Sequence, residues 1–381
     1  MFNDFVELVR EIYPNNEIIS LHAPVFNGNE KQYLSDSIDS TFVSTVGQMV
    51  GEFENQIASY VGVTDAIATM NGTAALHAAL LGVGVARGDE VITQSLSFVA
   101  TCNAIMYCGA DPVFVDVDGD TASLSATSLA EYLYEQAELR DEGAFSKSTG
   151  KRISACVPMH TFGLAANIHF IKKICDEWNI ELVEDSAEAL GTVCAGQMAG
   201  SIGKANILSF NGNKVLTTGG GGMILTNNKD VASKIRHLTT TARTAELYRF
   251  SHDQVGYNYR MPNLNAALGI AQFEQLGEFL NVKRRIAKIY QDWAEKAGVR
   301  MLSERAGTHS NYWLNALLFD SIYERDEFLE HTNNAEILTR AAWDPLHVLP
   351  MYRNCARGDL HNTMTLYHSV VNIPSGVPVV S

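Results

Sequence analysis

The 381-residue sequence lacks a membrane-spanning apolar run, a signal peptide and a basic patch that could bind nucleic acid. It contains no uninterrupted apolar run long enough to span a bilayer. Residues 1–13 combine apolar residues at helical spacing with acidic ones, so they predict an amphipathic helix and not a signal peptide. The net charge is −15, with 28 basic and 43 acidic residues and no dense basic patch. We therefore expect no membrane partner and no nucleic-acid partner.

Cysteine is scarce and scattered, which bears on metals and on cellular location. No two of the six cysteines form a C-x-x-C pair; they are Cys102, Cys108, Cys156, Cys175, Cys194 and Cys355. This spacing argues against a zinc site and favours free thiols in a reducing compartment. We expect no metal site, buried thiols and a cytoplasmic protein.

What the sequence does contain is a regular alternation of short apolar runs and longer segments. Seven runs have the length of buried strands: 66–70, 90–96, 112–117, 154–159, 181–184, 205–210 and 222–226. Most are separated by enough residues for a helix, which predicts an α/β fold with a mainly parallel seven-stranded sheet between helices. The last two runs flank only a loop, so they need not form a crossover unit.

The rhythm changes beyond about residue 250. A long helical pattern over 263–297 is followed by a strand-like run at 312–319 and a helix near 325–332. We predict an N-terminal helix (1–20), a large α/β domain (21–250) and a smaller C-terminal α+β domain (251–381).

The loop at 209–222 is the most unusual stretch, because a lysine, Lys214, follows a polar turn and precedes four glycines. A lone lysine on a turn is most often simply solvated. Here, however, a strand that ends in Glu184 and Asp185 lies about thirty residues upstream. A lysine amine can form a Schiff base, and a buried aspartate suits a pyridinium nitrogen. Our hypothesis is that Lys214 carries pyridoxal 5'-phosphate.

Other strand ends carry residues that fit this hypothesis, although each has an ordinary alternative. Gly72 and Thr73 open a helix and could bind an anion, or Thr73 could be a plain N-cap. Phe98 could stack on an aromatic ring or pack in the core. Asp185 could be an N-cap, and Glu188 lies one helical turn beyond it. Ser209 is a candidate phosphate donor. Because ligands of parallel sheets bind beyond the carboxyl ends of strands, these residues could converge.

The order of these candidate residues along the chain, and the motifs around them, resemble those of fold-type I pyridoxal-phosphate enzymes. Among these enzymes the sequence resembles the DegT/DnrJ/StrS family of nucleotide-sugar aminotransferases. The matching motifs are NGTAAL (71–76), SFVATCNAI (97–105), PVFVDVD (112–118), VEDSAEALG (183–191), SFNGNKVLTTGGGGM (209–223) and VGYNYRMPNLNAALG (255–269). The resemblance covers nearly the whole chain, from about residue 20.

The resemblance implies a role for each candidate. Lys214 would form the Schiff base, and Asp185 would pair with the pyridine nitrogen. Phe98 would stack on the ring, with Glu188 near its phenolic oxygen. The phosphate would be held by Gly72, Thr73 and Ser209. Asn258 corresponds to an asparagine that relatives lend to the neighbouring subunit's phosphate, which implies a homodimer.

A closer similarity is to the legionaminic-acid branch of the family, carried by segments 24–34, 42–54, 252–265, 311–315 and 372–376. It implies transfer of an amino group from glutamate to C4 of a nucleotide-linked 4-keto-6-deoxy sugar, with UDP-4-keto-6-deoxy-N-acetylglucosamine as the expected substrate and 2-oxoglutarate as the by-product. The product would enter surface-glycan or nonulosonic acid synthesis. Candidate substrate contacts are Ser44, Thr45, His160, Arg243, Arg249 and Arg260.

Two other functions are consistent with a similar sequence. One is a pyridoxal-phosphate sugar dehydratase, but its relatives typically carry histidine at the lysine position. The other is a non-catalytic sensor of a nucleotide sugar, which would not need Lys214 and Asp185 together. The aminotransferase remains the expected function.

Overall fold

The computed structural model describes residues 1–246 and 248–379, and its largest element is the predicted sheet. Seven strands lie in the order β1-β11-β10-β7-β6-β2-β3. They are β1 (Asp65–Thr69), β2 (Glu90–Gln94), β3 (Asp111–Val115), β6 (Ile153–Val157), β7 (Glu181–Asp185), β10 (Ala205–Ser209) and β11 (Gly222–Thr226). Only β11 runs antiparallel to its neighbours, β1 and β10. The predicted mainly parallel sheet is confirmed, as is the expectation that the last two strands form no crossover.

Successive apolar side chains of each strand point to opposite faces of the sheet, which explains why helices cover both faces. In β10, Ile207 packs with helices α4 and α8, whereas its neighbour Leu208 packs with α3 and α9. In β2, Val91 faces α4 and α5, and Ile92 faces α6 and α7. Successive strand side chains point to opposite faces, so apolar residues at consecutive positions require cover on both sides.

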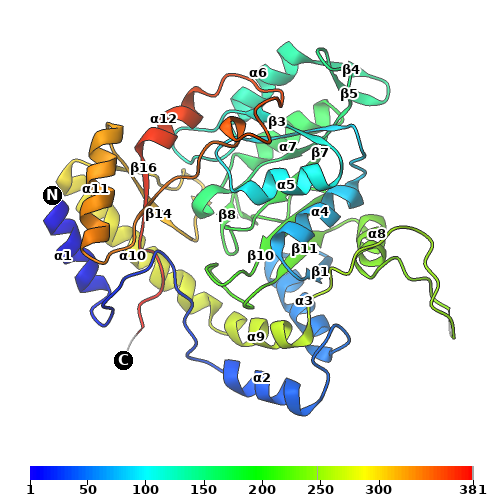
Figure 1. Cartoon of the computed structure of the whole chain (residues 1–381), viewed down its shortest axis with the longest axis horizontal. Coiled ribbons are helices and arrows are strands. Elements are labelled where there is room, and N and C mark those ends of the chain that lie inside the picture. Colours follow the sequence, from blue (N-terminus) through cyan, green and yellow to red (C-terminus); the bar gives the residue numbers. More distant parts are fainter. Residues whose placement is uncertain (247, 380–381) are drawn as a thin grey trace.

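The helices around this sheet form two layers (Figure 1). They are α2 (Glu30–Asp39), α3 (Gln48–Val61), α4 (Gly72–Val83), α5 (Val99–Tyr107), α6 (Ala126–Gln136), α7 (Ile168–Glu177), α8 (Lys229–Thr239) and α9 (Asn263–Phe273). None of the helices in the described residues is both long enough and apolar enough to cross a membrane.

A second, smaller sheet has the strand order β12-β14-β16-β15 and a core of its own. Its strands are β12 (Arg300–Met301), β14 (Asn315–Leu318), β15 (Arg340–Ala341) and β16 (Val370–Ile373), and its helices are α10 (Leu276–Ala297), α11 (Ile322–Asn334) and α12 (His361–Ser369). The predicted N-terminal helix, α1 (Phe2–Ile12), buries Phe5 and Val9 in this core, beside α11 (Figure 1). The domain bounds given above remain a prediction.

Two elements of the structure differ in detail from those predicted from the sequence. The helical pattern over 263–297 is interrupted between α9 and α10, where Glu274 accepts a hydrogen bond from Tyr33 and Gln275 donates one to Glu30. These contacts tie the interruption to α2. The strand expected over 312–319 is shorter and covers Asn315–Leu318, and Tyr312 has a left-handed φ of 45°, which lies outside the β region.

The remaining elements are short. The segment around residue 145 forms a hairpin of β4 (Ala137–Arg140) and β5 (Gly143–Ser146) at the top of Figure 1. A small sheet joins β8 (Val193–Cys194), β9 (Gln197–Met198) and β13 (Thr308–His309). Two 3-10 turns are η1 (Thr161–Gly163) and η2 (Leu346–Val348). All six cysteines are free.

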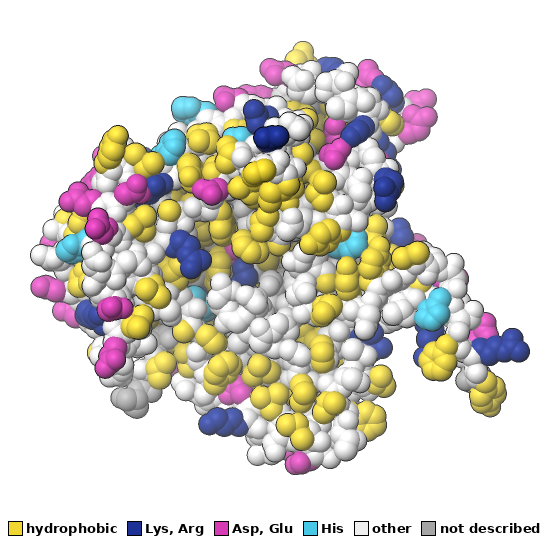
Figure 2. All heavy atoms as spheres, in the orientation of Figure 1, with side chains coloured by type: hydrophobic (Ala, Val, Ile, Leu, Met, Phe, Trp, Pro, Cys, Tyr) yellow, Lys and Arg dark blue, Asp and Glu magenta, His cyan; other side chains and the backbone are white. Residues whose placement is uncertain are grey.

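After α8 the chain leaves the body as an arm, which we define as residues 240–246 and 248–258. Pairing of Thr240 with Asn258 and of Arg243 with His252 holds its two sides together. The arm stands away from the body at the right of Figures 1 and 2.

Candidate active site

A cavity of about 720 Å³ lies where the carboxyl ends of the large-sheet strands meet the smaller sheet. Seven residues predicted from the sequence line it together: Gly72, Thr73, Phe98, Asp185, Glu188, Ser209 and Lys214. They lie at the carboxyl ends of four strands, β1, β2, β7 and β10, or just beyond them. The parallel strands therefore bring them together as expected for a site at the carboxyl edge of a sheet. Figure 2 shows basic side chains near the centre of this face of the molecule.

The Lys214 amine is held between an acid and an aromatic ring. Its Nζ lies 3.2 Å from Glu188 Oε1 and 3.9 Å from the centre of the Trp313 ring. The Trp313 indole in turn donates to the carbonyl of Asn213, at 2.7 Å. The lysine side chain is 14% exposed, so it is neither the freely solvated lysine of the alternative reading nor sealed in the core.

Asp185 ends β7 with a buried carboxylate. Thr101 Oγ1 donates to its Oδ2 at 2.8 Å, and the Ala187 amide donates to its Oδ1 at 3.2 Å. Burial raises the pKa of Asp185 above its ordinary value, and the hydrogen bond from Thr101 works in the opposite direction. The turn after β7 is not a helix, so Asp185 is not the N-cap that the alternative reading proposed.

Glu188 joins the lysine to the neighbouring turn. Its Oε2 accepts a hydrogen bond of 2.9 Å from the amide of Phe162, a residue in the left-handed region with φ 58°. Burial raises the pKa of Glu188 to about 7, although the nearby Lys214 charge lowers it. At neutral pH this carboxyl can thus hold or release a proton beside the lysine amine.

The start of α4 forms a close contact with the end of β10. The N-cap is Asn71, whose side chain accepts from the Ala74 amide at 2.7 Å, so Thr73 is not the N-cap. A Cβ added to Gly72 would lie 3.0 Å from Ser209 Cβ and 3.1 Å from its Oγ. Because residue 72 has no side chain, the hydroxyls of Thr73 and Ser209 and the first backbone amides of α4 can face the same part of the cavity. Such a group of donors suits an anion.

Phe98 precedes α5 and is 50% exposed in the cavity wall, so it is not a core residue. Its ring lies 6.3 Å from that of Trp343, which also lines the cavity.

The substrate candidates lie elsewhere in a single chain. Ser44 and Arg243 are exposed, and Thr45 and Arg260 are half-buried, and these four do not line the cavity. Arg243 stacks on Phe250 at 3.9 Å within the arm, where Arg249 and Asn258 are exposed.

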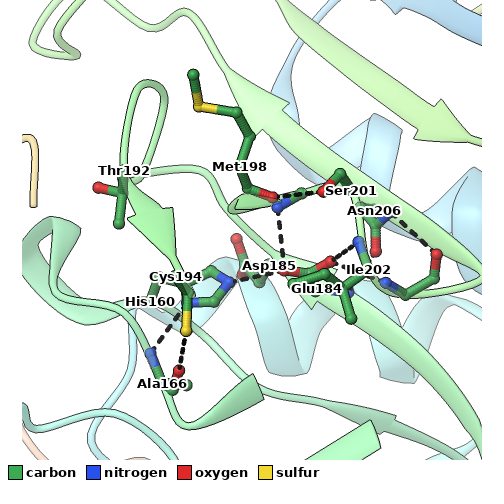
Figure 3. A network of polar contacts seen from close by, with 12 residues as sticks. His160, Ala166, Glu184, Asp185, Thr192, Cys194, Met198, Ser201, Ile202 and Asn206 are labelled. Carbon is green, nitrogen blue, oxygen red and sulfur yellow. Dashed lines mark hydrogen bonds and ion pairs between the residues drawn. The ribbon is translucent and has the colours of Figure 1, made fainter. Parts of the chain in front are cut away.

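His160 is fully buried in a polar network (Figure 3) and, contrary to the expectation of a substrate contact, does not line the cavity. Its Nδ1 accepts from the Ala166 amide at 3.1 Å, and its Nε2 donates to Glu184 Oε2 at 3.0 Å. Glu184 also accepts from the amides of Gly200, Ile202 and Gly203. Both ring nitrogens are therefore satisfied by the protein itself, and the network fixes the loop after β9 to the end of β7.

Sequence reasoning missed several residues of the cavity wall: His22, Thr101, Trp313, Arg340 and Trp343. Thr101 and Trp313 lie in segments that carry the family resemblance, 97–105 and 311–315, and the spacing of Thr101 from Phe98 could have indicated an inward-facing hydroxyl. His22, Trp313, Arg340 and Trp343 come from segments far from Lys214 in the sequence, so no local pattern connects them to it.

The fold defines the class: a fold-type I aminotransferase. The structure of the aminotransferase TlmJ from Streptoalloteichus hindustanus superposes with a TM-score of 0.86 at 26% identity, covering 96% of this chain and 95% of that one.

The chain belongs to the DegT/DnrJ/EryC1/StrS aminotransferase family, which matches residues 25–380. It is 36% identical over 363 residues to a GDP-perosamine synthase of Vibrio cholerae, covering 94% of each chain. It is 37% identical over 335 residues to EpsN of Bacillus subtilis, covering 88% of this chain and 84% of EpsN, which is provisionally named a pyridoxal phosphate-dependent aminotransferase. The protein is therefore an aminotransferase of this family.

Proposed function

We propose that this protein is a pyridoxal 5'-phosphate-dependent aminotransferase that moves an amino group from glutamate to C4 of a nucleotide-linked 4-keto-6-deoxy sugar. The observation that carries the proposal is Lys214, whose amine faces the cavity between Glu188 and Trp313 while Asp185 lines the same cavity. When bound, pyridoxal phosphate supplies an aldehyde that takes up the amino group and a ring that withdraws electrons.

The residues present fit this cofactor. Gly72, Thr73 and Ser209 would hold the phosphate, because they face one part of the cavity with amides and hydroxyls. Asp185 would pair with the ring nitrogen, since its buried carboxylate needs a cationic partner. Phe98 would stack on the ring, and Glu188 would lie near its phenolic oxygen.

Lys214 then has two tasks. Its Nζ would hold the cofactor aldehyde in the resting enzyme and, once released, would take the proton from the substrate carbon that carries the nitrogen. A positioned acid–base group contributes about 10²- to 10⁴-fold in rate. Glu188, 3.2 Å away, can take up or return a proton at that amine near neutral pH.

The identity of the sugar rests on two kinds of similarity. The segments shared with the legionaminic-acid branch favour UDP-4-keto-6-deoxy-N-acetylglucosamine, for a nonulosonic acid or another surface glycan. The name of the Vibrio cholerae relative favours a GDP-linked sugar instead. We therefore include both carriers in the test.

The proposed enzyme is a cytoplasmic homodimer. In a dimer, the exposed Asn258 would reach the phosphate of the neighbouring subunit. The exposed Arg243 and Arg249, with Arg260, Ser44 and Thr45, would supply contacts for the sugar diphosphate across the interface. Such an arrangement would account for the position of these residues outside the cavity of a single chain.

Mixing the purified protein, loaded with pyridoxal phosphate, with glutamate tests the proposal. The yellow colour should bleach and 2-oxoglutarate should appear, and both should be lost in Lys214→Ala. Mass spectrometry with a panel of UDP- and GDP-linked 4-keto-6-deoxy sugars then identifies the aminated product. A dehydratase would release water from the sugar without incorporating nitrogen. A sensor would bind the sugar without turnover, and either result would overturn the proposal.

A further inference from the structure

The cavity wall includes a histidine that neither the family motifs nor the proposed chemistry uses. His22 lies on a segment at residues 19–25, which we call the strap, and the strap is fixed at three points. Ile19 pairs with the Ile337 segment, the Leu21 carbonyl accepts from the Ser375 amide at 2.7 Å, and the Val25 carbonyl accepts from Gln272 at 2.8 Å. His22 is therefore presented to the cavity by a rigid backbone.

Both ring nitrogens of His22 are shielded from solvent and lack a hydrogen-bond partner among the described residues. Buried polar atoms in native proteins are almost always paired, and leaving two of them unpaired is unfavourable. His160 makes the contrast clear, because the protein satisfies both of its nitrogens. The unpaired atoms of His22 line a cavity, so a bound molecule can supply the missing partners.

The charge state of the His22 ring limits which chemical groups of a bound molecule can pair with both of its nitrogens. Burial holds the pKa of His22 well below its ordinary value, and the charges of Lys283 and Lys214 lower it further. The ring is thus neutral at pH 7, with one nitrogen donating and the other accepting. A carboxylate or phosphate offers only acceptors and would leave one nitrogen unpaired. A pair of hydroxyls, or a hydroxyl and an amide, satisfies both.

His22 comes from a different wall of the cavity than the cofactor candidates, although it lies near enough to Lys214 for the charge of that lysine to lower its pKa. The cofactor candidates lie at the carboxyl ends of the large-sheet strands, whereas His22 lies with Leu338, Thr339 and Arg340 on the wall formed by the strap and the smaller sheet. Lys283 supports this wall from behind, since its Nζ donates to the carbonyls of Trp313 at 3.1 Å and Ser375 at 2.5 Å.

We propose that His22 is a specificity-determining contact for the acceptor sugar, donating one hydrogen bond to a ring substituent and accepting one from a sugar hydroxyl. This inference rests on the proposed function, because it assumes that the acceptor occupies this wall while the cofactor occupies the other.

The two half-reactions test the inference separately. In His22→Phe, amination of the keto-sugar nucleotide should slow roughly 10- to 100-fold in kcat/KM, because two neutral hydrogen bonds are lost. The glutamate half-reaction, followed by bleaching, should change no more than about two-fold. His22→Asn and His22→Gln each keep one polar position and should recover part of the loss. His361→Phe, an exposed histidine outside the cavity, is the matched control.

Calorimetry of the amino-sugar nucleotide product binding to the holoenzyme gives a readout independent of turnover. The dissociation constant should rise about ten-fold in His22→Phe and remain unchanged in His361→Phe. Should His22→Phe not fold, His22→Asn and His22→Gln provide the same comparison.

The outcomes distinguish this inference from the proposed function. If the wild type does not respond to glutamate, the proposed function fails. If the wild type completes both half-reactions but the His22 variants slow both equally, or slow neither, the role of His22 is overturned.

Discussion

Two neighbours determine what the amine of Lys214 can do. The carboxyl of Glu188 accepts a hydrogen bond from the amine, and the ring of Trp313 offers a face for its positive charge. The indole of Trp313 also donates to the carbonyl of Asn213, which ties the ring to the lysine loop. An amine held this way is positioned before any ligand arrives, which is what a covalent cofactor site requires.

The raised pKa of Glu188 predicts how stability depends on pH. With the pKa raised from 4.5 to about 7, the unfolded chain loses this proton at a lower pH than the folded one. The free energy of unfolding therefore falls as pH rises from about 4.5 through 7, by an amount on the order of 3 kcal/mol. In Glu188→Gln this dependence is absent, so its melting temperature relative to the wild type should rise between pH 5 and pH 8.

Thermal unfolding of the cofactor-free protein across that range measures the effect. Glu7→Gln, on the exposed side of α1, should follow the wild type. A constant difference between Glu188→Gln and the wild type at every pH would contradict the assignment.

At the scale of elements, the contact between α4 and β10 makes a prediction of its own. Gly72→Ala places a methyl group 3.0 Å from Ser209 Cβ, which is closer than packed atoms tolerate. We expect a loss of roughly 1–3 kcal/mol in unfolding free energy from overpacking. In a Ser209→Gly background the same substitution should cost clearly less, because the opposing side chain is gone. Equal costs in both backgrounds, measured by chemical denaturation, would show that the two elements do not meet as described.

The same elements show what a sequence can predict. All seven strands of the large sheet were predictable because each is a short apolar run buried on both faces. Lys214, Asp185 and Glu188 were predictable because they follow such strands, and parallel strands end at one edge. The interruption between α9 and α10 was not, because it depends on side chains of α2, more than 200 residues earlier.

Two other residues of the cavity wall, Trp313 and His22, were not predictable for the same reason. Trp313 lies about 100 residues after Lys214 and His22 about 190 before it, so only the tertiary fold brings them together. His22 follows no periodic pattern, and a single histidine in a loop carries no signal until its surroundings are known. The positions of such residues depend on packing between segments that are far apart in the sequence, which local sequence patterns do not show.

At the scale of the whole molecule, the arm is the feature that predicts association with a second copy of the chain. It exposes three large apolar side chains, Tyr248, Phe250 and Val255, which are 92%, 79% and 80% exposed. Apolar residues gathered on a projecting segment favour contact with another surface. We expect the protein to be a dimer at micromolar concentration, with the arm against a second copy.

Analytical ultracentrifugation tests this expectation with one pair of variants. Phe250→Asp combined with Val255→Asp should shift the mass toward the 41.7 kDa chain and reduce transaminase activity, because Asn258 would lose its place at the neighbouring site. Tyr134→Asp, equally exposed on α6, should leave both unchanged. A wild type that is monomeric throughout would contradict the dimer.

The proposed function depends most directly on the covalent role of Lys214. Borohydride reduction of the protein loaded with pyridoxal phosphate, followed by peptide mass spectrometry, measures it. We predict one labelled lysine per chain, in the peptide that contains Lys214. A label on another lysine, or none at all, would contradict the account.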